Sequence, residues 1–334
     1  MRFLKRLSHM LLVLVGVSIL MFTLVRVIPG DPVAAALGDG VSREEIARIR
    51  QQMGLDRSIP VQYVHYIGGI LNGHFGMSLT EPKDVGEIIA ERLPATLELV
   101  TVAMLVAIAF GVPFGVISAV NRNGATDHVS RMVSLFGVSF PQFWVALMLQ
   151  LWLGAWLLLV PITGRSGLPP AEPITGFLLL DSLLKLDLAA FGDALRHILV
   201  PALVLAVGPL ANVTRLVRAS MIDELGKPYI ALNRAVGMPS FLINYKYALR
   251  NASLSALTVV GFLFPLMLGS AFVVEKVFVW PGIARFGADA IIANDFNAVV
   301  GVALVVCVFV VVINFLVDEL YGWIDPRIRL SAEP

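Results

Sequence analysis

The sequence predicts an all-α protein that crosses a membrane several times. Of its 334 residues, 57% are hydrophobic and only 15% are charged, whereas soluble domains are about half apolar and about a quarter charged. The mean hydropathy is +0.83, and the apolar residues gather in long stretches. An apolar excess of this size has no place in a water-soluble core. We therefore expect the chain to lie in a lipid bilayer.

Six stretches are long enough to cross the bilayer as helices, because a spanning helix needs about 20 mostly apolar residues. The predicted spans cover residues 8–28, 96–120, 129–160, 198–217, 253–274 and 298–320. Basic residues precede the first stretch, as in a secretory signal, but no small-x-small cleavage site follows it. We therefore predict that this stretch stays in the protein as an anchor.

The distribution of lysine and arginine predicts the orientation of the spans. Short connections on the cytoplasmic side of a membrane carry an excess of these residues. Here they gather before the first predicted span, after the second and fourth spans, and after the sixth. Both termini are therefore predicted to be cytoplasmic, which agrees with an even number of spans.

The connection between the first two predicted spans is too long and too regularly patterned for a simple loop. Ser42-Arg-Glu-Glu45 forms a capping box, in which two side chains satisfy free amide groups at a helix start. Further helices are predicted from Pro60 to Leu71 and from Val85 to Leu93. The predicted organisation is residues 1–29 with the first span, 30–95 as a helical insertion outside the cytoplasm, 96–320 as a five-helix core with a cytoplasmic loop at 219–250, and 321–334 as a cytoplasmic tail.

The third predicted span contains a proline in its interior. Pro141 is expected to kink this helix and to free backbone groups that must find partners inside the protein. Ser139, Pro141 and Trp144 are therefore candidates for a kink that lines a pathway, and a kink that only improves packing is an equal alternative. In the second span, Gly111 and Gly115 predict a close contact with another helix.

Charged residues are scarce within the predicted spans. Glu98 follows Pro94, and we expect it in the first turn of a helix, where a carboxylate complements the helix dipole. Asp318 lies near the inner end of the last span. Proton-driven carriers usually hold carboxylates or histidines near the membrane midplane, so the pattern predicts that energy for any transport comes from elsewhere.

Four charged or polar residues are predicted to lie at the same outer depth. Arg196 and His197 begin the fourth span, and Glu275 and Lys276 end the fifth. They are candidates for an outer gate or for a contact with a binding protein. The alternative is that they only anchor the helix ends by extending toward the membrane surface.

Several classes of chemistry have no support in the sequence. It lacks a phosphate-binding G-x-x-x-x-G-K-[ST] loop, and its five histidines are scattered without metal-ligand spacing. The single Cys307 sits in an apolar run and is expected to be a packing residue. A net charge of +1 gives no overall basic field for nucleic acid. We therefore expect no catalytic residue, metal or cofactor in this chain.

The segment from Arg218 to Ser240 contains a short predicted helix. Pro228 suits its first position and Gly237 lies just past its end. Its apolar side chains give it more apolar surface than a solvated loop needs, namely Tyr229, Ile230, Leu232, Ala235 and Val236. The helix either rests on lipid headgroups or docks in a groove of a cytoplasmic partner.

This segment resembles the cytoplasmic coupling motif of the inner-membrane permease subunits of binding-protein-dependent ABC importers. Gly237 matches the glycine of the motif, and Tyr229-Ile230 and Arg234-Ala235 match the version typical of dipeptide and oligopeptide permeases. Similar blocks occur in order along nearly the whole chain, at residues 28–32, 53–55, 75–78, 92–97, 139–144, 197–202, 274–283, 314–318 and 325–329.

The segment also departs from the peptide permeases. Ala231, Leu232, Asn233 and Val236 stand where those proteins usually carry Arg, Thr, Ala and Lys, and Ser255 stands where a proline usually follows the loop. The coupling loop is therefore less basic than usual. This difference leaves room for a dedicated ATPase partner.

The resemblance implies a type I ABC importer permease fold in the bacterial inner membrane. It implies that the chain pairs with a second, similar permease and is served by two cytoplasmic ATPase subunits and a periplasmic solute-binding protein. The residues expected to meet the ATPases are Asp223, Glu224, Tyr229, Ile230, Arg234, Ala235, Gly237 and Met238.

The substrates implied by the resemblance are di- or oligopeptides. Glutathione, nickel chelates, opines and oligosaccharides are alternatives within the same class of importer. Two other classes stay open, namely an ATP-independent channel or carrier, and a membrane enzyme with a polar cluster such as Ser139 with His197.

Overall fold

The computed structural model describes residues 2–27, 56–169 and 172–324, together with the single positions 42, 44, 48 and 51. Within these residues the regular structure is helical and no strand occurs, apart from an isolated bridge between Met77 and Asp84. The prediction of an all-α protein is confirmed. Most of the helix predicted to begin at Ser42 lies outside the described residues, as does the tail from residue 325 onward.

The chain folds into two compact units. One consists of Met1–Thr96 and Pro281–Val311, and the other of Leu97–Trp280 and Val312–Pro334. The first unit contains α1 (Arg2–Val27), α4 (Ile59–Leu71), the start of α5 (Val85–Val120), α12 (Ile283–Ile292) and the start of α13 (Phe296–Ile324). The second unit contains the rest of α5 and the end of α13. Its other helices are α6 (Ala125–Ser139), α7 (Gln142–Leu149), η1 (Gln150–Trp156), α8 (Leu178–Leu184), α9 (Leu188–Leu225), α10 (Pro228–Ala235), η2 (Leu242–Ala248) and α11 (Leu249–Val277).

The core of the first unit lies where the start of α5 packs against α12 and α13. Its buried side chains are Val85, Ile88, Ile89, Ile283, Phe286, Ala290, Ala298 and Val302. Gly301 permits the close approach, because a Cβ at this position would lie 2.7 Å from Cγ1 of Val85. Elsewhere in this unit, the ring of Phe22 on α1 lies 5.3 Å from the ring of Tyr63 on α4.

Helix α5 is longer than predicted. Asp84 caps its start by accepting a hydrogen bond from the Gly86 amide at 2.7 Å. The helix then continues through Pro94 for 36 residues, so the prediction of a separate helix at 85–93 is wrong. Pro94 removes the helical donor to the carbonyl of Ala90, and Ala90 is exposed, so solvent can take the place of that donor. The predicted boundary at residue 95 falls inside this helix, and the division into four parts stays a prediction.

Helix α9 is the centre of the second unit and contacts α6, α7, α8 and α11. Its contact with α5 relies on two glycines, as predicted. A Cβ at Gly111 would lie 3.0 Å from Val213, and one at Gly115 would lie 2.7 Å from Val217. Any larger side chain would separate the two helices.

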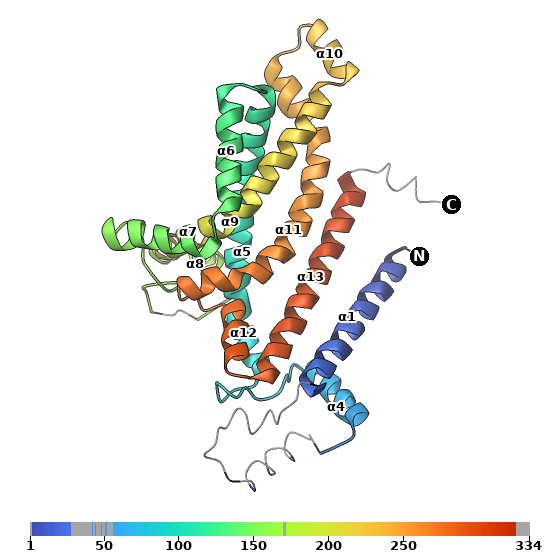
Figure 1. Ribbon diagram of the computed structural model, residues 1–334, viewed down its shortest axis with the longest axis vertical. Helices are drawn as coiled ribbons and strands as arrows, with labels where there is room; N and C mark the ends of the chain where they lie inside the picture. The colour runs from blue at the N-terminus through green and yellow to red at the C-terminus, as the bar shows by residue number, and fades with distance from the viewer. Residues whose placement is uncertain are drawn as a thin grey trace. The chain divides into compact units, whose positions relative to one another are not determined.

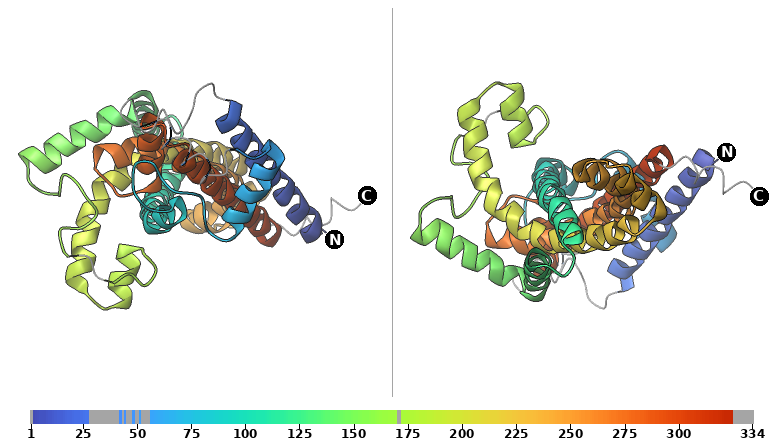
Figure 2. Two further views of the ribbon diagram at one scale, coloured as in Figure 1. Left: turned by 90° about the horizontal axis from the view of Figure 1, so that it is seen from below. Right: turned by 90° about the horizontal axis from the view of Figure 1, so that it is seen from above.

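The predicted third span is not one helix. Helices α6 and α7 meet at an angle of 102° around Phe140 and Pro141, and Figure 1 shows α6 upright and α7 lying across it. Phe140 has extended backbone angles, as expected for a residue before proline. In both views of Figure 2, α7 and η1 extend away from the bundle of α5, α6, α9 and α11. The predicted kink is therefore a complete break.

Several helices of the described residues are long and apolar enough to cross a membrane. Four pass this test as single helices, Val85–Val120, Leu188–Leu225, Val259–Val277 and Phe296–Val317, and a fifth crossing results if the broken pair is one span. The apolar stretch Met10–Thr23 of α1 is shorter. The membrane-protein prediction is confirmed, and the number of six spans stays a prediction.

Candidate functional site

Helix α10 lies at the end of the second unit opposite α7 and α8 (Figure 1). It begins at Pro228, as predicted, and ends at Ala235, one residue before the predicted end at Val236. Gly237 follows with φ +75°, and its amide donates to the Arg234 carbonyl at 3.0 Å. The Met238 amide donates to the Asn233 carbonyl at 3.1 Å. These two bonds form a Schellman motif, which requires the left-handed conformation that glycine adopts without strain.

Glu224 holds the turn that leads into α10. Its carboxylate is largely buried, accepts a hydrogen bond from the Tyr229 hydroxyl at 2.8 Å and pairs with Lys227. Asn251, near the start of α11, donates to the Tyr229 oxygen at 3.0 Å. Glu224 and Tyr229 therefore tie the end of α9, the start of α10 and the start of α11 together.

The same contacts shift the ionisation of the residues that join Glu224. Burial and the hydrogen bond to Glu224 raise the pKa of Tyr229. The hydrogen bond to Glu224 raises the pKa of Lys227. Tyr229 therefore stays a neutral hydroxyl donor and Lys227 stays charged at physiological pH.

The apolar face that α10 presents to solvent differs from the predicted one. Ile230 is fully buried within the chain, so its side chain has no apolar surface for a partner. Tyr229 is partly buried and its hydroxyl is held by Glu224. Leu232 and Val236 are 63% and 69% exposed. Phe241 and Tyr245 add to them, with ring centroids 4.8 Å apart. We name Leu232, Val236, Phe241 and Tyr245 the α10 apolar surface.

Helical spacing could have identified this surface from the sequence. Leu232 and Val236 are four residues apart, as are Phe241 and Tyr245, and residues at this spacing share one helix face. The other predicted coupling residues divide between exposed and partly covered positions. Asp223, Arg234, Ala235 and Gly237 are exposed, and Met238 is partly buried.

A buried ion pair lies at the same end of the unit and was missed by the sequence analysis. Asp127 is 0% exposed, and its carboxylate accepts two hydrogen bonds from Arg218, at 2.6 and 2.9 Å. It also accepts hydrogen bonds from the Ser118 hydroxyl at 2.6 Å and the Asn123 amide at 2.9 Å. This cluster joins α5, α6 and α9, and no pattern in the sequence pairs residues so far apart.

At the opposite end of the unit, Glu98 forms a second buried ion pair. Glu98 is 3% exposed, and one oxygen accepts from Arg165 at 2.5 Å while the other accepts from the Leu179 amide at 2.7 Å. Arg165 also donates to the Gly176 carbonyl at 2.6 Å and lies over the ring of Trp280. The expectation that Glu98 only complements a helix dipole is wrong, because α5 begins 13 residues earlier, at Val85.

Two further carboxylates organise the segment between η1 and α8. Asp193 accepts hydrogen bonds from the Ser166 hydroxyl at 2.6 Å and the Gly167 amide at 2.9 Å. Asp181 accepts from the Thr175 hydroxyl at 2.6 Å and from backbone amides of residues 174–176. Burial opposes ionisation of Asp181, but these hydrogen bonds outweigh burial and lower its pKa.

The four predicted gate residues lie in different environments. The His197 ring is buried and its Nδ1 lies 2.8 Å from the Asp193 carbonyl, whereas Arg196 and Lys276 are exposed. Glu275 is 0% exposed. Anchoring by extension to the membrane surface does not describe Glu275, because its side chain is enclosed by protein. A gate role for the four residues stays a prediction.

The predicted kink residues are largely exposed. The Ser139 hydroxyl donates to the Leu135 carbonyl of its own helix at 2.8 Å. The ring of Trp144 stacks on Phe140 at 5.1 Å between centroids, and Phe140 stacks on Phe136 at 5.9 Å. Aromatic stacking therefore continues across the break at Pro141, and a pathway role for these residues stays a prediction.

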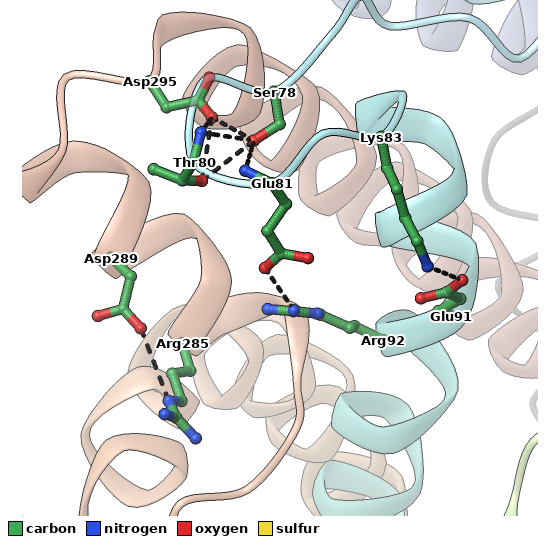
Figure 3. Close-up of polar contacts among 9 residues, drawn as sticks. All are labelled: Ser78, Thr80, Glu81, Lys83, Glu91, Arg92, Arg285, Asp289 and Asp295. Carbon is green, nitrogen blue, oxygen red and sulfur yellow. Dashed lines mark hydrogen bonds and ion pairs between the residues drawn. The ribbon is translucent and has the colours of Figure 1, made fainter. Parts of the chain in front are cut away.

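In the first unit, Asp295 organises a polar cluster at the start of α13 (Figure 3). One of its carboxylate oxygens accepts from the Ser78 hydroxyl at 2.5 Å and the Leu79 amide at 2.8 Å, and the other accepts from the Ala298 amide at 3.1 Å. Nearby, Arg92 pairs with Glu81 at 2.6 Å. Asp295 thus fixes the segment before α5 to the first turn of α13.

Metal binding finds no support in the part of the chain that the structure describes, where no group of three or more His, Cys, Asp or Glu side chains is placed to hold an ion. What the described residues offer is a set of buried ion pairs that hold helices together and an exposed apolar surface at one end.

Comparison with known proteins gives this arrangement its context. Residues 111–330 match the family described as binding-protein-dependent transport system inner membrane component, and residues 1–100 match the N-terminal component of the same systems. The chain belongs to this family. It is therefore a membrane-spanning component of a transport system.

Several relatives are similar over nearly the whole permease chain. The dipeptide transport system permease protein DppB of Escherichia coli K12 is 38% identical over 331 residues, which cover 98% of both chains. The probable D,D-dipeptide transport system permease protein DdpB of the same strain is 40% identical and covers 97% of this chain and 96% of its own. The di/tripeptide transport system permease protein DppB of Pseudomonas aeruginosa is 39% identical, with 97% of both chains covered.

A solved structure of the MetNI methionine ABC transporter, in an inward-facing conformation, has a similar fold. One of its chains superposes with a TM-score of 0.52 at 17% identity and covers 69% of this chain and 93% of its own length. The fold predicted from the resemblance is confirmed.

Proposed function

We propose that this permease is one transmembrane subunit of an ATP-driven importer for dipeptides or other short peptides. The observation that carries the proposal is the similarity over nearly the full chain to permeases named for dipeptide and di/tripeptide transport. In this proposal the chain forms half of the pathway with a second permease, two ATPase subunits bind on the side of α10, and a solute-binding protein delivers the peptide on the other side. Both termini then face the ATPases.

The α10 apolar surface is the part of the chain proposed to meet an ATPase subunit. Leu232 and Val236 are exposed on α10, while Ile230 and Tyr229 hold the helix to the rest of the unit. An apolar helix face that is exposed at the end of a bundle suits a groove on a partner protein. A displacement of α10 would reach α9 and α11 through Glu224, Tyr229 and Asn251.

From α9 the displacement would spread to α5 and α6. Arg218 lies on α9 about two turns before the end of that helix, and its pair with Asp127 joins α9 to the start of α6. We propose that these contacts make α5, α6 and α9 move as one body when the ATPases close, which is the kind of rocking that alternating access requires.

Transport by the complete complex tests this function. The permease, its partner permease, the two ATPases and the binding protein are reconstituted in liposomes, and uptake of a labelled dipeptide is measured with and without ATP. We expect uptake that requires both ATP and the binding protein. Uptake without ATP would favour a channel or carrier and would overturn the proposal.

The substrate is tested separately on the binding protein. A ligand that binds only the folded protein raises its apparent melting temperature, so dipeptides, tripeptides, glutathione, nickel chelates, opines and oligosaccharides are compared in a thermal shift assay. Stabilisation by short peptides supports the proposal. Stabilisation by another of these compounds, and not by peptides, would leave the assignment as an ABC importer intact and would identify that compound as the substrate.

A further inference from the structure

A short stretch of the segment between η1 and α8 connects the ends of three helices of the second unit. We name this stretch, residues 162–168, the outer strap. The Gln150 side chain of η1 donates a hydrogen bond to the Ile162 carbonyl at 2.7 Å. The Gly164 amide donates to the Phe278 carbonyl at 2.9 Å. These two bonds fix the start of the outer strap to η1 and to the end of α11.

Two carboxylates fix the rest of the outer strap to α5 and α9. Arg165 donates to Glu98 of α5 at 2.5 Å. The Ser166 hydroxyl and the Gly167 amide donate to one carboxylate oxygen of Asp193 on α9, at 2.6 and 2.9 Å. The outer strap therefore joins α5, α9 and α11 at the end of the unit opposite α10.

The two carboxylate contacts differ in their exposure to solvent. The side chains of Glu98 and Arg165 are only 4% and 14% exposed. The side chain of Asp193 is 23% exposed, and its partners Ser166 and Gly167 are exposed. Breaking a buried ion pair leaves an unpaired charge inside the protein, whereas water can replace the partners of an exposed carboxylate. The contact with α9 is therefore the one that opens more easily.

His197 lies under the outer strap at this weaker contact. A Cβ at Gly167 would lie 3.7 Å from Cε1 of the His197 ring, and the ring is buried. Nδ1 of His197 donates to the Asp193 carbonyl at 2.8 Å, because a carbonyl oxygen can only accept. Successive turns of α9 thus carry the carboxylate that holds the strap and the ring that the strap covers.

We propose that residues 166–168 form a lid over the outer end of α9, with Arg165 as its hinge and Asp193 as its latch. The structure shows the lid closed over His197. When the latch breaks, residues 166–168 leave α9, while the pair of Arg165 with Glu98 keeps the outer strap on α5. The purpose of the lid rests on the proposed function: it opens to admit the peptide from the binding protein and closes behind it.

Cysteine accessibility tests the latch without any transport measurement. His197→Cys, combined with Cys307→Ser, is reacted with a maleimide in the assembled complex. Adding Asp193→Asn should speed this labelling about tenfold, the difference between a charge-assisted and a neutral hydrogen bond. Val204→Cys, at a buried position of the same helix, is the control and should label at the same rate with and without Asp193→Asn. Equal labelling of His197→Cys in the two backgrounds would overturn the latch.

A reversible crosslink tests whether the lid opens during transport. In the complete complex, Ser166→Cys and Asp193→Cys are joined by a short bis-methanethiosulfonate reagent, which a thiol reductant removes. We expect dipeptide uptake to fall to its level without ATP and to return after reduction. Leu195→Cys with Leu199→Cys, four residues apart and exposed on α9, is the control pair, and its crosslink should leave uptake unchanged.

The two experiments separate the lid from the proposed function. Normal uptake while mass spectrometry shows a complete crosslink between positions 166 and 193 would overturn the lid and leave the importer assignment intact. Absence of dipeptide uptake in the unsubstituted complex would contradict the proposed function instead. The lid is then decided by the labelling of His197→Cys, which needs no substrate.

Discussion

Asp127 and Arg218 form a two-point ion pair although 91 residues separate them in the sequence, with the two nitrogens of the guanidinium 2.6 and 2.9 Å from the carboxylate. The Ser118 hydroxyl and the Asn123 amide use the remaining acceptor capacity of Asp127. These contacts therefore connect the end of α5, the first turn of α6 and the last third of α9, and Arg131 of α6 lies 3.6 Å from the same carboxylate.

Loss of one member of this pair should destabilise the permease strongly. Arg218→Ala leaves the Asp127 carboxylate enclosed without its main partner, and we expect a cost of about 3 kcal/mol, the lower bound for broken buried pairs. We use the lower bound because the Arg218 side chain is partly exposed, so solvent weakens the pair. Thermal unfolding of the purified chain measures the effect.

A double-mutant cycle separates the pair from its two members. Each single change leaves one charged partner without its counterpart, whereas the combination of Asp127→Ala with Arg218→Ala removes both charges. The double change should therefore cost less stability than the sum of the two single changes. Arg122→Ala, at an exposed position between α5 and α6, is the matched control and should stay near the unsubstituted protein. Additive costs in the cycle would show that the pair does not couple α6 to α9.

Gly237 should tolerate substitution less well than a neighbouring glycine. Its φ of +75° is strained for any other residue, so Gly237→Val should cost about 1–3 kcal/mol locally and displace α10. Gly226→Ala is the control, because Gly226 has φ −82° and a Cβ there meets nothing closer than 3.6 Å. We expect Gly237→Val to lose ATP-dependent uptake in a complex that still assembles. Normal uptake by this variant would contradict the proposal that α10 couples the ATPases to transport.

Substitutions at Leu232 and Ile230 should affect different properties of the permease, uptake for Leu232 and stability for Ile230. Leu232→Glu places a charge on the exposed α10 apolar surface and should reduce uptake without lowering the melting temperature. Ile230→Ala removes a fully buried side chain and should cost about 2–5 kcal/mol of stability. Leu188→Glu, at an exposed position at the other end of α9, controls for the added charge. A stable Leu232→Glu variant with full uptake would contradict the docking role.

Asp181 should give the permease a stabilising contribution that depends on pH. Its pKa is lowered in the folded state from an ordinary value of 3.8, so the folded form binds fewer protons than the unfolded form. The stability from Asp181 is therefore complete above about pH 5 and falls as the pH drops below about 4. The melting temperature of Asp181→Asn should lie below that of the unsubstituted permease at pH 7, and the gap should narrow toward pH 3. A gap that is independent of pH would show that ionisation of Asp181 is not involved.

The sequence predicted the features that depend on neighbouring residues. The long apolar stretches, the glycine face at Gly111 and Gly115, and both ends of α10 follow from local patterns, and the structure contains all of them. The ion pairs Asp127–Arg218 and Glu98–Arg165 could not be predicted, because only the folded chain brings their members together. Side-chain direction was also out of reach for Ile230, since a short helix with apolar residues on several sides does not indicate which side faces inward.

The glycine contact between α5 and α9 restricts how the two helices can move against each other. A shift of α5 along α9 by one turn would bring the Cβ of Ala107 or Ala119 to positions where a Cβ would lie 2.7–3.0 Å from Val213 or Val217. Sliding of α5 along α9 by a full turn is therefore sterically blocked. A push on α10 that moves α9 would carry α5 with it, because the contact at Gly111 and Gly115 keeps the two helices in one register.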